Sequence, residues 1–480
     1  MALVGKKVRE SVVIVALSGR AWRRTMAQES KEHTKRVIVM IAIVMLGSCF
    51  GNLSQTALNA MFAGMAQDFG VDVGLGQWVT TLYMLVLGIT VPVVTYLMKH
   101  FSLKRVILGS LVLLLLGGAI AAVAWNFPIL IIGRVLQAIS AGITMPMMMS
   151  LIMMTVPRNQ QATAMGIAGI AMGFAPNIGP TIGGWMLETA GWRSFFIALT
   201  VCSLVLVLLA MILVRDSSSG DKGYRLDFIS LLQSALGFGG LLLGFSNASS
   251  YNIVSPLIWV PVAVGALFLV LFLRRQRRVE MPLIDLAIFD SKNYRIGFWT
   301  MNFLYASFMG ITLVIPLYIE NLWGGTALQA GLALLPGTIA AFVVNPLAGV
   351  LTDRIGARPV IIVSSVCLAL GATLMVFVDE TTPFWVIFLM QGIRAVGVSG
   401  LIGPLNSWGM GELPPSLMTD ASSFGTAVRQ ACASLGTALM VYAIVAGPLM
   451  GSVAMGYHVG FGFSAACALV VLAIAVVRVR

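Results

Sequence analysis

The composition of this chain excludes a soluble globular domain. Of its 480 residues, 59% are hydrophobic and only 10% are charged, which indicates a protein with many membrane-spanning segments. The net charge of +12 does not indicate nucleic-acid binding, because the basic residues lie in short segments between apolar runs rather than on one amphipathic face. The five cysteines lie inside apolar runs, so we expect neither disulfides nor a metal site.

Residues 1–36 are basic and contain a short apolar stretch, VVIVAL, at 12–17. This stretch is near the lower limit for a signal peptide and is followed by further arginines, so we do not expect cleavage. We predict a cytoplasmic tail that is disordered or lies on the membrane surface. A translation start at Met26 is the alternative.

The rest of the chain reads as a series of membrane spans, since crossing a hydrocarbon core of about 30 Å takes roughly 20 apolar residues. This criterion predicts fourteen spans, at 37–62, 76–98, 106–125, 128–155, 163–189, 194–214, 228–248, 254–273, 296–319, 330–352, 360–378, 384–410, 421–447 and 458–477. With the amino terminus in the cytoplasm, only Arg193 is left outside. The positive-inside bias therefore predicts that both termini are cytoplasmic.

Polar side chains crowd the outer end of the first span, where the sequence reads GNLSQTALNAMF from position 51. Asn52, Gln55, Thr56 and Asn59 recur at i, i+3, i+4 and i+7, so they share one face of a helix, with Ser54 nearly opposite. A polar group in hydrocarbon costs free energy unless it finds a partner. We therefore expect these side chains to line a substrate cavity or to contact a neighbouring helix.

A repeated pattern predicts two six-helix halves. The loops KHFSLKR (99–105) and DRIGARP (353–359) each lead into an apolar span and then into a helix with an embedded arginine, Arg134 or Arg394. We predict a tail at 1–36, an N-terminal half at 37–214, two inserted helices with a cytoplasmic linker at 215–295, and a C-terminal half at 296–480.

The order of several motifs resembles the major facilitator superfamily. GVLTDRIGAR (349–358) resembles its loop signature, and APNIGPTIGG (175–184) resembles the fifth-span signature of its antiporters. With LSQTALN, QWVTTLYMLVLGITVP, GWRSFF and AVRQACASLGTAL, the chain is most similar to the fourteen-span EmrB/QacA drug:proton antiporters, in their lincomycin-resistance-like branch. The resemblance implies an all-α major facilitator fold with two extra helices between the halves.

The loop signature at 349–358 predicts a gate. Gly356 allows a tight turn, and Asp353 can accept backbone donors at the amino end of the next helix. Arg354 and Arg358 can pair with acids or lipid phosphates. In the first half Lys99 stands where the acid is expected, so we expect only the second half to keep the full latch. An ordinary basic loop is the alternative.

The fifth predicted span is rich in glycine and proline, which predicts a kinked helix whose backbone a neighbour can approach closely. The gating residues that we expect there are Pro176, Gly179, Pro180, Gly183 and Gly184. This helix is expected to seal against a partner in the other half. Helix packing without a role in gating is the alternative.

Three arginines, Arg134, Arg394 and Arg429, lie inside predicted spans, where an unpaired guanidinium is costly. Arg134 with Gln137 resembles the family's R-x-x-Q motif, which implies a part in proton transfer. We expect Arg394, Arg429 and Asn177 in the substrate cavity. Polar contact between helices is the competing interpretation.

The acid that would couple transport to protons is less evident. Antiport of this kind needs a titratable group that meets each side of the membrane in turn. Members of the resembled group carry an aspartate at the position aligned with Ser54, and this chain has no acid there. The remaining candidates lie near membrane boundaries, with Glu188 and Glu320 at outer ends and Glu412 and Asp420 at the cytoplasmic entry to span thirteen. Glu320 is the first choice and Asp420 the second. A solvated acid at a helix end is the competing interpretation for each, and the sequence favours it.

The predicted function is secondary active transport, with proton-coupled export of amphiphilic drugs or toxic compounds. Embedded arginines without a central acid favour neutral, anionic or lincosamide-like substrates over dications. An exporter or flippase of a native lipid or metabolite with non-standard coupling is the alternative. A non-transporting membrane sensor or scaffold is a more distant one.

The chain carries no phosphate-binding G-x-x-x-x-G-K-[ST] motif, metal-ligand cluster or nucleophile with a base partner, so we expect neither an enzyme nor a cofactor. The expected partners are an amphiphilic small molecule, protons and the lipid bilayer of the plasma membrane, without nucleic acid. A possible adaptor protein is left open.

Overall fold

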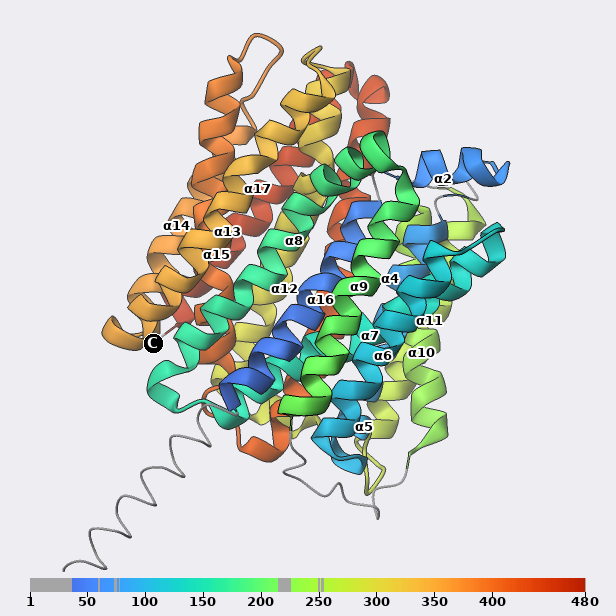
Figure 1. Cartoon of the computed structure of the whole chain (residues 1–480). Helices are drawn as coiled ribbons and strands as arrows, with labels where there is room; N and C mark the ends of the chain where they lie inside the picture. The colour runs from blue at the N-terminus through green and yellow to red at the C-terminus, as the bar shows by residue number, and fades with distance from the viewer. Residues whose placement is uncertain are drawn as a thin grey trace, which may run out of the picture.

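The computed structural model describes residues 37–58, 61–72, 76, 78–214, 226–248, 251 and 254–479. These residues form a bundle of long helices without strands (Figure 1). Twelve helices are long and apolar enough to cross a membrane, and two bent helix pairs bring the number of spans to 14. The predicted all-α fold with fourteen spans is therefore confirmed. The predicted tail at 1–36 and Asn59 lie outside the described residues.

The helices follow one another with short connections. In the earlier part of the chain they are Val37–Ala57, α2 (Phe62–Phe69), α4 (Trp78–Thr90), α5 (Val93–His100), α6 (Leu103–Ala122), α7 (Phe127–Thr155), η2 (Arg158–Gln160), α8 (Gln161–Ala190), α9 (Trp192–Leu213), α10 (Phe228–Asn247) and α11 (Pro256–Gln276). The later ones are η3 (Leu286–Asp290), α12 (Lys292–Asn321), α13 (Ala327–Ile355), α14 (Ala357–Met375), α15 (Phe384–Met410), η4 (Pro415–Leu417), α16 (Met418–Ala446), η5 (Gly447–Met450) and α17 (Val453–Arg478).

Two of the predicted spans differ in shape from the expectation. The first helix ends at Ala57 rather than at 62, and α2 follows as a separate short helix that ends at Gly70, where φ is +63°. The second predicted span, 76–98, is divided into α4 and α5, which meet at an angle of 50°. Pro92 lies at this break, and proline lacks the N–H that would continue the helix.

The two helices of the predicted insertion pack against each other, and α10 joins them to the bundle by lying beside α4 and α16. Their end nearest the linker is held by an ion pair, because Arg275 Nε donates to Asp227 Oδ2 over 2.7 Å. The hydrogen bonds from Arg275 and Ser230 lower the pKa of Asp227 to about 2, so this carboxylate stays charged near neutral pH. Asp227 also caps α10 by accepting from the N–H of Ile229.

Helices α8 and α13 approach each other so closely that their main chains touch. A Cβ added at Gly166 would meet the backbone carbonyl of Asn345, and one added at Gly349 would meet the carbonyl of Ala162. Such close approach is available only to glycine, since any side chain would force the backbones apart. The α8–α13 contact joins the two predicted halves of the chain.

The apolar core is distributed unequally along the bundle. One large cluster joins helices from both predicted halves, with Val94, Met153, Ile361 and Met418 among its members. This cluster lies toward the end of the bundle with the basic loops, which we call the basic end (bottom in Figure 1). At the opposite end the described residues form two separate clusters, one within 57–199 and one within 311–461.

The close contact between α8 and α13 predicts a difference between two glycines of the same helix. Gly166→Ala should reduce stability by about 1–3 kcal/mol, because the new methyl group meets main-chain atoms that cannot move aside. Gly184→Ala is the matched control, since a Cβ there meets nothing within 4 Å. Thermal unfolding in detergent measures both, and equal melting temperatures for the two variants would contradict this packing.

Candidate functional site

The polar cluster of the first helix divides between two neighbouring helices. Ser54 is fully buried and donates to Gln137 Oε1 of α7 over 3.0 Å. It also accepts a hydrogen bond of 2.7 Å from Arg134 Nη1, which donates over 2.7 Å to the same Gln137 oxygen. Ser54, Arg134 and Gln137 therefore form one buried network, which the sequence had placed in two separate motifs.

Arg134 is held on its other side by α4. Its Nε donates to the carbonyl oxygen of Val79 over 3.2 Å, and its Cζ lies 4.1 Å from the centre of the Tyr83 ring. The hydroxyl of Tyr83 donates in turn to the carbonyl oxygen of Gly51 over 2.8 Å. The guanidinium thus ties the first helix, α4 and α7 together, without an ion pair to any described acid.

The opposite face of the first helix contacts α8. Asn52 Nδ2 donates to the carbonyl oxygen of Ala171 over 3.3 Å, and Thr56 Oγ1 donates to that of Ala175 over 3.0 Å. Gln55 is half-buried. These contacts support the alternative in which this polar face serves helix association.

The glycine and proline positions of α8 do not all face the same neighbour. The helix bends by 43° between Ala175 and Asn177, the position of Pro176, as the sequence predicts. Gly179 and Gly183 lie against Thr56 and Ala57 of the first helix, and nothing lies within 4 Å of a Cβ at Gly184. Gly179 and Gly183 therefore face the first helix of their own half. The predicted contact of this helix with the other half is made with α13, from Gly166 before the bend to Asn177 after it, where the Asn177 side chain lies against Gly337. A role of these residues in gating, Pro180 included, stays a prediction.

Asp353 accepts backbone hydrogen bonds, as predicted, but from a different helix. Asp353 Oδ1 accepts from the backbone N–H of Ala162 over 3.1 Å, and its Oδ2 accepts from the N–H of Thr163 over 2.7 Å. Both donors belong to the first turn of α8 rather than to the next helix, α14, so that expectation is corrected. The positive end of the α8 dipole meets a carboxylate from the other predicted half.

The other residues of this loop signature lie at the surface. Gly356 adopts a φ of +90° in the turn that joins α13 to α14, as expected of a glycine there. Arg354 and Arg358 are exposed. Neither forms an ion pair with an acid in the part of the chain that the structure describes.

The corresponding loop of the first half also contacts the other half. Here the loop supplies the cation and the partner helix supplies the acid. Lys99, in the last turn of α5, places Nζ 3.1 Å from Oδ2 and 3.3 Å from Oδ1 of Asp420. Asp420 lies in the first turn of α16 and is fully buried, whereas Lys99 is 28% exposed. The expectation that only the second half keeps a latch is wrong, and so is the alternative of a solvated Asp420. The helix also begins at Met418, ahead of the predicted limit of 421.

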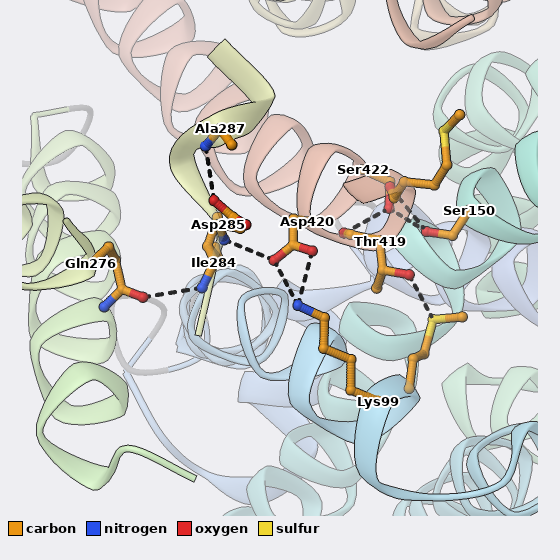
Figure 2. Close-up of polar contacts among 11 residues, drawn as sticks. Lys99, Ser150, Gln276, Ile284, Asp285, Ala287, Thr419, Asp420 and Ser422 are labelled. Atoms are coloured by element: carbon orange, nitrogen blue, oxygen red, sulfur yellow. Dashed lines mark hydrogen bonds and ion pairs between the residues drawn. The ribbon is translucent and has the colours of Figure 1, made fainter. Parts of the chain in front are cut away.

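The linker that follows the inserted helices also donates a hydrogen bond to the carboxylate of Asp420 (Figure 2). The backbone N–H of Asp285 donates to Asp420 Oδ1 over 2.9 Å, and that of Ile284 donates to Gln276 Oε1 over 3.1 Å. Gln276, at the end of α11, donates to Ser230 of α10 over 2.7 Å. These hydrogen bonds, joined through the backbone of Ile284 and Asp285, connect the two inserted helices to the Lys99–Asp420 pair.

Two further contacts cross between the predicted halves beside this pair. Ser150 of α7 hydrogen-bonds with Ser422 of α16, and the Thr419 hydroxyl points to the sulfur of Met98 (Figure 2). The serines and Lys99 are contacts that sequence reasoning missed. Only Lys99 left a signal, since it occupies the position of the acid in the repeated loop.

The remaining embedded arginines lie in the second half of the chain. Arg394 is 1% exposed, and its Nε donates to Gln391 Oε1 over 2.8 Å. Arg429 donates to Thr426 over 2.8 Å and approaches the sulfur of Met149 of α7 at 3.4 Å. Asn177 shares a small cavity with Arg394. Arg429 lies at a different cavity, so the expected cavity residues are divided between two places.

Glu320 does not join any of these groups. It lies exposed in the last turn of α12, at the end of the bundle opposite the Lys99–Asp420 pair. Among the two predicted coupling acids, only Asp420 is buried among helices from both halves.

Comparison with known proteins agrees with this architecture. The family model described as Major Facilitator Superfamily matches residues 44–437. The uncharacterized MFS-type transporter YcnB of Bacillus subtilis is 32% identical over 415 residues, which cover 86% of this chain and 87% of that protein. The lincomycin resistance protein LmrB of Bacillus subtilis is 31% identical over 425 residues, which cover 88% of each chain.

A solved structure shows the same fold at low sequence identity. The human organic anion transporter MFSD10 (TETRAN) superposes with a TM-score of 0.63 at 12% identity, covering 91% of this chain and 99% of that one. The family match spans most of the chain, and the helical bundle agrees with it. This chain is a member of the Major Facilitator Superfamily.

Proposed function

We propose that this membrane transporter exports amphiphilic compounds from the cytoplasm in exchange for protons. The observation that carries the proposal is the pair of contacts at the basic end, where Asp353 and the Lys99–Asp420 pair each join the two predicted halves. Similarity to a lincomycin resistance protein supports a drug-like substrate. The embedded arginines, without an acid paired to them among the described residues, favour neutral or anionic compounds.

The contacts at the basic end fit a state that is closed on one side. Polar latches and one shared apolar cluster join the halves there, whereas the opposite end has two separate clusters. With the basic loops in the cytoplasm, as the positive-inside bias indicates, this is an outward-facing arrangement. Opening to the cytoplasm requires both latches to separate.

Asp420 is the coupling acid in this proposal, and Glu320 is set aside because it is exposed at a helix end. Protonation of Asp420 removes the negative charge that holds Lys99, which weakens the latch and favours opening to the cytoplasm. For exchange, the proton comes from the outer side in the outward-facing state, and its arrival at this carboxylate produces the state that can load substrate. The proton then leaves to the cytoplasm while the basic end is open, and the Lys99–Asp420 ion pair forms again on closing. The Arg134–Ser54–Gln137 network, without an acid, serves to hold α7 in place.

Proton flux in inverted membrane vesicles tests the function directly. With an acid interior imposed, lincosamides, neutral amphiphiles and cationic dyes are added in turn while the gradient is followed. We expect neutral or anionic compounds to dissipate it only in vesicles that contain the protein. Movement of labelled substrate without any proton flux would contradict coupling, and absence of both would contradict export.

The two latches predict parallel effects of neutralising each acid. Asp353→Asn and Asp420→Asn should each lower the initial transport rate at least about 5-fold, because each loses a charge-assisted hydrogen bond. Membrane levels should be unchanged. Asp290→Asn is the matched control, since this acid is exposed in η3 of the same linker. A normal rate in both latch variants would refute the gating role, and retained proton flux in Asp420→Asn would exclude it as the coupling acid.

The buried network predicts that Ser54→Asp will leave substrate charge preference unchanged. The new carboxylate would lie beside Arg134 Nη1, which is 2.7 Å from the Ser54 oxygen, and would pair with it inside the helix contact. The ratio of monocationic-dye uptake to neutral-amphiphile uptake in inverted vesicles should be the same in Ser54→Asp and in the uncharged control Ser54→Asn. A rise of about 3-fold or more in Ser54→Asp alone would show that this network faces the substrate and would contradict its structural role.

A further inference from the structure

A small cavity lies between α8, α12, α13 and α15, where the two predicted halves meet. Its walls are formed in part by Asn177, Phe308, Gly337, Gln391, Arg394 and Ser399. Arg394 is 1% exposed, Asn177 is 4% exposed and Phe308 is 4% exposed, so the polar groups here are enclosed by protein. A charged side chain in such surroundings is costly unless its donors are used.

The donors of Arg394 are mostly unused by the protein. A guanidinium has five N–H donors, and the one hydrogen bond found for Arg394 runs from Nε to Gln391. Its Nη1 is buried without a hydrogen-bond partner among the described residues, and no described acid forms an ion pair with it. Across the cavity, Asn177 Oδ1 is likewise buried without a partner, while Asn177 Nδ2 donates to the carbonyl oxygen of Gly173.

The counterpart of Arg394 in the other predicted half uses more of its donors, although its Nη2 is also buried without a partner among the described residues. Arg134 donates to Val79, Ser54 and Gln137, and it stacks 4.1 Å from the Tyr83 ring. Around Arg394 the ring of Phe308 is 5.9 Å away and Gln391 is the sole acceptor found. Arg134 and Arg394 occupy the same position in the repeat. Arg134 is enclosed by packed helices, whereas Arg394 borders a cavity.

We propose that Arg394 binds the carboxylate of an amphiphilic anionic substrate, and that Asn177 accepts a hydrogen bond from an N–H or O–H beside that carboxylate. This inference rests on the proposed transport function and names the chemical class of its substrate. The guanidinium fork matches a carboxylate in shape as well as in charge. In this state the cavity, about 10 Å³, holds no more than a group the size of a water molecule. Only the carboxylate end is therefore placed there, and the helices around it must separate to admit the rest of the molecule.

The position of this site also suits a transporter that changes conformation. Asn177 belongs to α8 in the first predicted half, whereas Gly337 of α13 and Arg394 of α15 belong to the second. A substrate held by both Asn177 and Arg394 therefore contacts both halves at once. Its binding energy depends on their relative arrangement, which is what alternating access requires of a substrate site.

Equilibrium binding to the purified full-length protein in a non-ionic detergent tests the proposal. The probes are N-dansylphenylalanine and its carboxamide, which share the fluorophore, the ring and the sulfonamide N–H and differ in the negative charge. Fluorescence titration should show the carboxylate binding at least about 10-fold more tightly, as a charge-assisted hydrogen bond provides. Arg394→Gln should remove this preference, and Arg394→Lys should keep part of it, since the charge remains and the fork is lost.

Two further variants complete the design. Asn177→Asp places a second carboxylate in the cavity and should weaken carboxylate binding while Arg394 stays in place, so it decides the outcome if Arg394→Gln does not fold. Arg158→Gln removes an equal charge from an exposed turn and should leave the preference unchanged. Equal binding of the two probes to the parent protein, or an unchanged preference in Asn177→Asp or in folded Arg394→Gln, would overturn the proposal.

The result is separable from the test of transport. Binding in detergent needs no proton gradient, so a carboxylate preference that depends on Arg394 stands even if vesicles show no proton flux. Conversely, proton-coupled export of neutral drugs by a protein without this preference supports the proposed function and refutes the anion site.

Discussion

A charge buried in this bundle must find its partner within the protein, because the hydrocarbon around the helices offers none. The described charged groups meet this condition in different ways. Arg134 is surrounded by hydroxyl, amide and carbonyl oxygens and by an aromatic ring, Asp420 is paired with Lys99, and Asp353 is held by the first turn of α8. Arg394 uses fewer of its donors than Arg134, with one hydrogen bond among the described residues and Nη1 buried without a partner. In our proposal this cation beside a cavity is the place where a substrate binds.

The same constraint explains the arrangement of the basic end. A carboxylate can be stabilised either by backbone N–H groups at a helix start or by an ammonium group, and the chain uses one solution in each of its repeated loops. In the second loop, Asp353 meets the start of α8. In the first loop, a lysine takes the place of the acid, and the partner helix supplies Asp420 instead. In both cases a carboxylate joins helices from different halves. In the second loop the carboxylate belongs to the loop, and in the first it belongs to the partner helix.

The inserted helices gain a role from this exchange. Their linker reaches Asp420 through the backbone N–H of Asp285, and Gln276 and Ser230 hold the linker to the two helices. Because Asp420 is shared between Lys99 and the linker, separation of α5 from α16 also changes the environment of the linker. The insertion is thereby connected to the ion pair that joins the two predicted halves.

The sequence by itself determined the membrane class, the spans, the fold and the two carboxylates at the basic end, because hydrophobic runs, loop charges and glycine spacing are local properties of a chain. Tertiary structure alone decided which residues meet. The partner of Asp353 lies 191 positions away at Ala162, and the partner of Asp420 lies 321 positions away at Lys99. Pairs so far apart in the chain produce no periodic pattern in the sequence. The contrast between Arg134 and Arg394, equivalent in the repeat, likewise depends on neighbours brought in by other helices, and our proposal of a binding role for Arg394 rests on this contrast.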